Sequence, residues 1–322
     1  MENGAVGSQF HHLPVLLDEC LAGLNINPDS ACLDCTLGGA GHSSEILKRL
    51  GPGGLLVGID RDREAIEAAT SRLSAIDSQA RFLCLHGNFH DAPALLSACN
   101  IDRGLDCILV DLGVSSHQLD VRERGFSYHE DAPLDMRMDQ SQPLSAREIV
   151  NRWSEDELNH ILRDYGEEKW ARQIARVICD RRKTAPIETT GQLVEIIDAA
   201  IPKKFRQGDG SHPARRSFQA LRIAVNDELE PLEPALRALA GLLNPGGRLC
   251  VITFHSLEDR IAKNVFRSLA DPCTCPKSFP VCMCGKKPVV KLITRKPITA
   301  GAEELARNPR SRSASLRIVE KL

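Results

Sequence analysis

The chain has 322 residues, of which 42% are apolar and 26% are charged, and its formal net charge is −2. This balance excludes a mostly disordered chain and a collagen-like chain, and the length suggests one large domain or two of ordinary size. No run of about 18 apolar residues is present, so a membrane-spanning helix is not expected. Residues 1–9 lack the basic and apolar regions of a secretory signal, and we therefore expect a cytoplasmic protein.

The charge is unevenly distributed along the chain. Residues 1–121 carry 7 basic and 16 acidic residues, whereas residues 286–322 carry 10 basic and 3 acidic residues. The stretch Lys203–Arg216 adds five basic residues against one acid. The basic segments are either a surface for a polyanion or solvated surface with no partner.

The first third of the chain alternates short apolar runs with helical patterns. Strands are expected at 31–37, 55–59, 80–85 and 107–110, with helices at 43–50 and 63–73. This order predicts βαβ units and a parallel sheet that is covered on both faces. We assign residues 1–121 to the first part of an α/β domain.

Strand-like runs are missing from residues 122–216, where helical patterns dominate. Helices are expected at Ser145–Trp153, Glu155–Tyr165, Glu168–Arg182 and Thr190–Ala200. We predict that residues 122–216 form an all-helical domain inserted into the α/β domain.

Residues 217–322 return to the α/β pattern and are expected to form its second part. In order, we expect a long helix over Ser217–Ala240, a turn at Asn244–Gly247, a fifth strand at Arg248–Phe254, a helix that Ser256 caps with Asp259 at the third position, a late strand at Val289–Thr294 and a basic tail over Ala300–Leu322.

A glycine-containing loop follows the first expected strand, in the stretch Asp34–His42. Glycines there allow a tight turn and a close approach of the backbone to a ligand, and Asp60 ends the next strand, where an acid can accept both ribose hydroxyls of a nucleoside. Because position 44 is Ser, the loop does not complete the Gly-x-Gly-x-x-Gly pattern of dinucleotide sites. This favours S-adenosylmethionine over a nicotinamide cofactor but leaves both open, together with an ordinary turn.

A third acid, Asp111, ends the fourth expected strand. Asp34, Asp60 and Asp111 thus fall at or near the carboxyl ends of three strands, where doubly wound sheets bind their ligands. For Asp111 alone, a helix cap is the alternative interpretation.

Several long motifs occur together and in order. The chain thereby resembles the bacterial 16S rRNA cytosine-N4 methyltransferases of the MraW/RsmH type, through residues 12–19, 34–43, 58–60, 87–89, 111–120, 124–128, 133–139, 165–168, 212–222, 254–260 and 308–312. The resemblance implies a class I, Rossmann-like, S-adenosylmethionine-dependent methyltransferase sheet with an inserted helical domain. It also implies N4-methylation of a cytidine in 16S rRNA near the decoding centre, with the small ribosomal subunit as partner.

Position by position, the resemblance implies a cofactor site at Ala40, Gly41, His42, Asp60, Phe89, Asp111 and Gln118. The backbone of residues 40–42 would line the methionine moiety, Asp60 would hold the ribose and Phe89 would pack against the adenine. Asp111 and Gln118 would lie near the sulfonium and the incoming base. Position 40 departs from the pattern, because many relatives have Gly there.

The catalytic hypothesis centres on Asp111. The cytosine amine is a poor nucleophile, so an acceptor beside its N–H₂ group would help, and Asp111 or a backbone carbonyl in 112–115 could serve. Methylation at carbon 5 would instead need a cysteine nucleophile, and none lies in residues 111–118. Two functions without methyl transfer stay open, a nicotinamide-dependent oxidoreductase and a non-catalytic rRNA-binding assembly factor.

Four of the twelve cysteines are crowded together over residues 273–284. Cys273, Cys275, Cys282 and Cys284 could close a tetrahedral zinc site, and reduced thiols in a loop are the alternative. The basic segments Lys203–Arg216 and Lys286–Arg317 could grip rRNA phosphates. Candidates for contact with the substrate, each also explicable by packing or local hydrogen bonding, are Phe126, Tyr128, Trp170, Phe205, His212 and His255.

Overall fold

The computed structural model describes residues 13–205, 212–276, 278–279 and 281–322. Within these ranges no helix is long and apolar enough to cross a membrane. His12 of the first motif and residues 206–211 of the first basic segment lie outside the described residues.

One eight-stranded sheet forms the centre of the α/β part. Its order is β3-β2-β1-β4-β5-β8-β6, with β7 paired to β8. The first five strands are parallel, and β8 runs antiparallel to both β5 and β6. The strands are β1 (Ala31–Asp34), β2 (Leu55–Asp60), β3 (Arg81–His86), β4 (Leu105–Asp111), β5 (Leu243–Thr253), β6 (Val290–Leu292), β7 (Ile298–Thr299) and β8 (Ser315–Lys321). The expected α/β domain with a parallel sheet is confirmed, and β8 and its neighbours extend that sheet with antiparallel strands.

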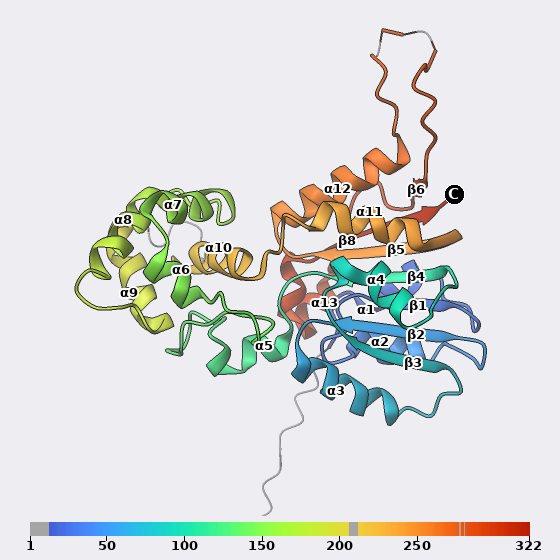
Figure 1. Ribbon diagram of the computed structural model, residues 1–322, viewed down its shortest axis with the longest axis horizontal. Helices are drawn as coiled ribbons and strands as arrows, with labels where there is room; N and C mark the ends of the chain where they lie inside the picture. The colour runs from blue at the N-terminus through green and yellow to red at the C-terminus, as the bar shows by residue number, and fades with distance from the viewer. Residues whose placement is uncertain (1–12, 206–211, 277, 280) are drawn as a thin grey trace, which may run out of the picture.

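Helices cover both faces of this sheet (Figure 1). One face packs against α4 (Ala92–Ala98), α11 (Leu232–Leu242) and α12 (Ser256–Ala270), and the other against α1 (Leu17–Leu24), α2 (Gly41–Leu47) and α3 (Arg63–Ser74). Residues 107–110 of β4 are apolar throughout because both faces of the strand are buried there. Ile108 and Val110 pack on the side of α4, α11 and α12, whereas Cys107 and Leu109 pack on the side of α1, α2 and α3. A strand buried on both faces has no position for a polar side chain except at its ends.

A separate group of helices lies beside the sheet (Figure 1). It comprises α6 (Ala146–Arg152), α7 (Glu155–Asp164), α8 (Ala171–Arg181), α9 (Thr190–Ala200) and α10 (Arg215–Asn226), which share one apolar core. The short helices α5 (Ser116–Asp120) and η2 (Arg122–Arg124) lead into it, and η3 (Lys203–Phe205) follows α9. The expected boundary after residue 216 falls inside α10, whose Phe218, Leu221 and Val225 pack into this core. We therefore propose that the helical insert extends to Asn226.

The long helix expected over Ser217–Ala240 is two helices. Residues 227–231 separate α10 from α11, and Asp227 has a left-handed backbone with φ of +48°. The cap expected at Ser256 lies one residue earlier, because His255 is the N-cap and Glu258 is the third helical residue. The turn at 244–247 is an irregularity within β5, where the register with β4 shifts.

The C-terminal residues do not form the expected basic tail. After α13 (Ala302–Arg307) and η4 (Pro309–Ser313), the chain enters the sheet as β8, between β5 and β6. Leu316 and Val319 are fully buried. The strand has no continuous apolar run, because Arg317 lies in its middle. The Arg317 side chain can be buried there because it donates two hydrogen bonds, of 2.7 and 2.8 Å, to Asp259.

This placement predicts a large effect of truncating a C-terminal side chain. Leu316→Ala should lower the free energy of unfolding by about 2–5 kcal/mol, because it leaves a cavity in the sheet core. Leu322→Ala is the matched control: that side chain is 56% exposed, and its loss should cost about 0.5 kcal/mol or less. Urea denaturation measures both, and equal effects would contradict the assignment of β8.

Candidate active site

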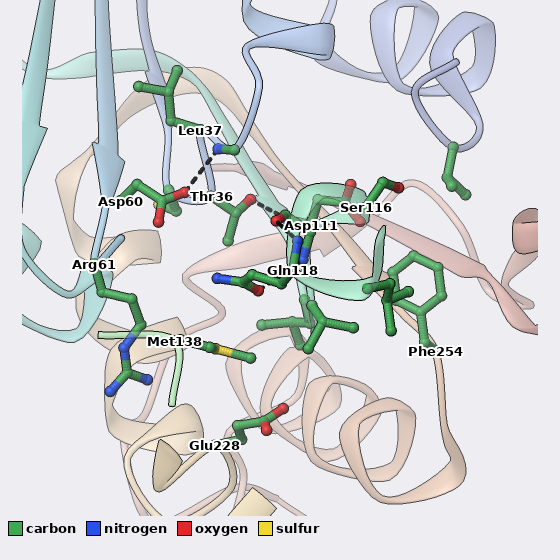
Figure 2. Close-up of a pocket in the computed structure, with 18 of the residues that line it drawn as sticks. Thr36, Leu37, Asp60, Arg61, Asp111, Ser116, Gln118, Met138, Glu228 and Phe254 are labelled. Atoms are coloured by element: carbon green, nitrogen blue, oxygen red, sulfur yellow. Dashed lines mark hydrogen bonds between the residues drawn. The ribbon is translucent and has the colours of Figure 1, made fainter. Parts of the chain in front are cut away.

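A cavity of about 530 Å³ lies at the carboxyl ends of the parallel strands. Figure 2 shows side chains from several elements around it. Its lining includes the loop 35–39, Asp60, Phe89 and Asp111 from the sheet domain, together with Tyr128 and other residues of the segment 122–226. Doubly wound sheets bind ligands at this edge.

The loop after β1 folds back over the end of β2. Gly38 and Ala40 both have left-handed backbones, with φ of +47° and +57°. The Gly38 N–H donates to Asp60 Oδ2 at 2.7 Å, a bond drawn in Figure 2. Asp34 is buried and accepts from Ser43 Oγ at 2.6 Å and from the Thr36 N–H at 3.1 Å. Asp34 therefore fixes the loop and is not among the residues that line the cavity.

Asp60 lines the cavity as expected. Its second oxygen, Oδ1, accepts from the Asp62 N–H at 2.9 Å. Burial raises the pKa of Asp60 to about 6, although the two backbone N–H donors act to lower it. Each oxygen keeps a free lone pair, so the carboxylate can still accept hydrogen bonds from a ligand.

Of the three residues 40–42 that were expected in the cofactor site, only two line the cavity. Gly41 and His42 line the cavity, whereas Ala40 is fully buried and is not among the lining residues. A Cβ at position 41 would approach Pro14 Cγ to 2.7 Å, so glycine is needed there for packing against residue 14. Ala40 keeps the left-handed backbone in spite of its Cβ, which costs about 1–2 kcal/mol relative to the right-handed form.

His42 is held as a neutral ring. Its Nε2 atom lies 3.0 Å from the Val15 carbonyl oxygen, which can only accept, so Nε2 carries the proton. Burial lowers the pKa of His42 to about 4, which keeps the imidazole uncharged. The other ring nitrogen, Nδ1, lies 3.8 Å from Asp111 Oδ2.

Asp111 has an unsatisfied oxygen. Its backbone N–H donates to Thr36 Oγ1 at 2.7 Å, but its buried Oδ1 atom has no hydrogen-bond partner. Burial, followed by Asp34 and Glu258, raises the pKa of Asp111 well above its ordinary value. A buried acceptor without a partner costs about 1–3 kcal/mol, which a ligand can recover.

Phe89 and Gln118 also line the cavity. Phe89 begins η1 (Phe89–Asp91), which Asn88 caps through a bond to the His90 N–H. The Gln118 side chain is occupied by protein partners: its Oε1 accepts from the Ser115 N–H at 3.0 Å, and its Nε2 donates to Asp62 Oδ2 at 3.0 Å. Gln118 thus holds the 111–118 loop in place as well as facing the cavity.

The same Asp62 oxygen pairs with Arg124 at 2.8 Å. Only 2% of the Arg124 side chain is exposed, and its guanidinium also donates to the carbonyls of Arg137 and Met138. One buried cation therefore joins α3, the start of the insert and the segment at 137–138.

A buried cluster of charges was not among the expected site residues. Arg222 donates to both oxygens of Glu228, at 3.0 and 2.9 Å, and both residues line the cavity with Glu258. Burial acts to lower the pKa of Arg222, but Glu228 and Glu258 outweigh it and raise that pKa. Phe254 and Met138 add apolar walls. Arg222, Phe254, Glu258 and Met138 all lie in motifs that carry the family resemblance, so those motifs were the signal that could have found them.

Of the aromatic and histidine residues expected to contact the substrate, only Tyr128 lines the cavity. Tyr128 lines the cavity and stacks on His212, with ring centroids 4.8 Å apart. Phe126 is a core residue of the insert. Trp170 and Phe205 pack together at 5.3 Å, away from the cavity lining, and neither His212 nor His255 is among the lining residues.

Several cations of the second basic segment are paired with acids. Arg317 binds Asp259, and Arg307 lies 3.2 Å from Glu304. Arg310 pairs with Asp120 and lines the cavity. Unlike the rest of the segment, Arg310 therefore stands where a ligand in the cavity can meet it.

Comparison with known proteins assigns the chain to a family. Residues 9–322 match the sequence profile of the MraW methylase family. The chain belongs to the MraW methylase family. It is an S-adenosylmethionine-dependent methyltransferase, and the interpretations as an oxidoreductase or a non-catalytic factor are wrong.

Three curated relatives, each called ribosomal RNA small subunit methyltransferase H, match over nearly the whole chain. The relative from Clostridioides difficile is 52% identical and that from Clostridium botulinum (strain Kyoto) 54% identical, each over 98% of this chain and 100% of the relative. The relative from Symbiobacterium thermophilum is 53% identical over 97% of both chains.

The buried arginine gives a stability prediction. Arg124→Met should lower the free energy of unfolding by about 3–5 kcal/mol, because Asp62 is left as a buried charge without its partner. Arg152→Met is the control, since the side chain of Arg152 is 76% exposed beside Glu148, and its loss should cost under about 1 kcal/mol. Fluorescence of the two tryptophans, Trp153 and Trp170, follows unfolding of the insert in urea. Equal losses would contradict the role given to Arg124.

Proposed function

We propose that this chain methylates N4 of a cytidine in the rRNA of the small ribosomal subunit, at the position numbered 1402 near the decoding centre. The observation that carries the reaction is the unpartnered Asp111 carboxyl oxygen at the end of β4, inside the cavity. The substrate class follows the relatives, which act on the small subunit rRNA by name. We place the reaction in the cytoplasm.

The cavity residues fit S-adenosylmethionine. Asp60 would accept from the ribose hydroxyls, Phe89 would pack against the adenine, and Gly41 with His42 would line the methionine moiety. Bound there, the sulfonium supplies an activated methyl group. Of the arginines in the lining, Arg222 and Arg310 are paired with acids, and Arg61 donates to the Asn226 carbonyl at 2.9 Å. Asp111 lies in the same lining at the end of β4, and its carboxylate would attract the sulfonium.

Asp111 is proposed to accept the hydrogen bond and then the proton of the attacking amine. Its Oδ1 atom has no other partner, and its backbone is held by Thr36 at 2.7 Å. A raised pKa makes its carboxylate a stronger base than an ordinary Asp, once a neighbouring positive charge has ionised it. The neutral ring of His42 beside it does not compete for that proton, because its own pKa is about 4.

The target base must leave its stack to reach the cavity. Tyr128 and Phe254 offer aromatic surfaces in the lining, and Arg215 and Arg310 are cations in the same lining that suit phosphate contact. Methylation at carbon 5 would need a thiolate nucleophile, and Cys35 is the one cysteine among the described residues that line the cavity. Burial and then Asp34 raise the pKa of Cys35, which keeps it a thiol.

The role of Asp111 is tested by Asp111→Asn. Turnover should fall by about 100-fold or more, since asparagine cannot take a proton. Binding of S-adenosylhomocysteine, measured by calorimetry, should change little. Asp77→Asn, outside the cavity lining, is the control. Wild-type turnover in Asp111→Asn would overturn the assignment.

The pH dependence of binding tests the same residue in the wild-type protein. Burial raises the pKa of Asp111, and a nearby sulfonium would favour its carboxylate, so binding S-adenosylmethionine should shift Asp111 towards its ionised form and release protons. Affinity for S-adenosylmethionine relative to neutral S-adenosylhomocysteine should rise with pH, by up to about tenfold per unit. The contribution of Asp60 to the pH dependence cancels in this ratio, because Asp60 would contact the same ribose in both ligands. A ratio independent of pH, or one unchanged in Asp111→Asn, would contradict this account.

The product decides the proposed function. The protein is incubated with S-adenosylmethionine and small subunits from a strain that lacks this gene, and the rRNA is digested to nucleosides for mass spectrometry. N4-methylcytidine is the expected product. Its absence, with donor binding intact, would leave the cofactor site standing and reject the substrate; 5-methylcytidine would reject the role of Asp111.

A further inference from the structure

The segment between α12 and β6 stands apart from the rest of the fold. It extends away from the sheet as a long loop (Figure 1), and its described residues, 271–276, 278–279 and 281–289, form no helix or strand. Its apolar side chains are exposed: Phe279 by 51%, Val281 by 68% and Met283 by 75%. A loop with so little buried surface cannot be ordered by its own hydrophobic contacts.

Four thiols converge inside this loop. The Sγ atoms of Cys273, Cys275, Cys282 and Cys284 all lie within 4.8 Å of one another. Cys282 Sγ lies 3.5 Å from Cys273, 3.9 Å from Cys275 and 3.4 Å from Cys284, and Cys284 lies 4.0 Å from Cys273. Four sulfurs at about 2.3 Å from a tetrahedral zinc ion are about 3.8 Å apart, which these distances bracket.

Pairwise disulfides do not explain this arrangement. All four cysteines are free, and Cys282 has three sulfur neighbours where a disulfide joins only two atoms. The N–H groups of Met283 and Cys284 both donate to Cys275 Sγ, at 3.2 Å each. Backbone N–H donors of this kind stabilise a thiolate ligand and fix its orientation.

We propose that these four cysteines bind one zinc ion as a closed structural site. Thiolates are soft ligands that favour zinc over magnesium or calcium, and four of them leave no open position for a reacting water. On binding, each thiol releases its proton to solvent. Lys286 and Lys287 follow the last ligand and offset the excess negative charge of a four-thiolate zinc site.

The zinc site is separate from the methyl-transfer cavity. Phe254, two residues before α12, and Glu258, in its first turn, line that cavity, whereas the cysteines follow the C-terminal end of the helix. The helix has 15 residues and so spans about 22 Å. Loss of the metal should therefore disorder the loop and leave the cofactor site intact.

Metal content tests the proposal directly. The full-length protein, purified under reducing conditions without chelator, should contain about one zinc per chain by inductively coupled plasma mass spectrometry. The double variant Cys282→Ser, Cys284→Ser should contain none. Cys99→Ser is the matched control, because Cys99 is an exposed free thiol outside the loop, and it should keep its zinc.

Two further measurements on the same preparations keep the result interpretable. Stripping the zinc should speed tryptic cleavage after Lys286, while affinity for S-adenosylhomocysteine stays unchanged. Cobalt added to the stripped wild-type protein should give the strong thiolate-to-metal absorption of a tetrahedral site, so the proposal does not depend on the variant folding. Four freely titrating thiols with no bound zinc, bound iron in its place, or disulfides within the loop would each overturn it.

Discussion

The buried guanidinium of Arg124 is the contact on which the geometry of the active site depends. It meets Asp62 at 2.8 Å and Glu64 at 3.2 Å, and it donates to two carbonyls of the segment that ends at Met138. Asp62 caps α3 and also accepts from Gln118, so the loop that carries Asp111 is tied to the same point. A buried ion pair adds little net stability compared with an apolar pair, but removing one partner is costly. The arrangement therefore fixes how the insert meets the sheet more than it strengthens the fold.

The cavity itself is electrostatically unfavourable without a ligand. Asp60 and Asp111 both have raised pKa values, chiefly through burial, and one oxygen of Asp111 has no partner. For such acids the folded state holds protons that the unfolded state releases, so the stability they contribute falls as pH rises above their ordinary pKa. A protein retains groups of this kind where binding or chemistry needs them. The same burial that weakens the fold means that a positive charge placed beside either acid would favour its ionised form.

The sequence allowed the local features to be predicted, and the long-range pairings escaped prediction. Strands buried on both faces read as apolar runs, so β1, β2 and β4 and the acids at their ends could be placed before the structure was known. Strand β8 escaped because Arg317 sits in the middle of it, and only its pairing with Asp259, 58 residues away, makes that position tolerable. The expected boundary at residue 216 cuts through α10, because an amphipathic pattern does not say which core a helix faces. Arg124 and the pair Arg222–Glu228 depend on partners that spacing alone does not reveal.

Helix α12 links two sites whose chemistry is independent. At its start, Glu258 accepts from the N–H groups of Phe254 and His255 at 2.8 and 3.3 Å, which fixes the cavity wall after β5. At its end, the chain leaves the sheet for the loop that carries the four thiols and returns at β6, where the Val289 N–H donates to the Leu269 carbonyl at 2.9 Å. The two ends of the loop are thus held together at the end of α12. Only the middle of the loop lacks contacts with the rest of the fold that would fix its conformation. A metal bound there can hold the exposed side chains of the loop in one arrangement without altering the distances around Asp111, because a packed helix of 15 residues lies between them.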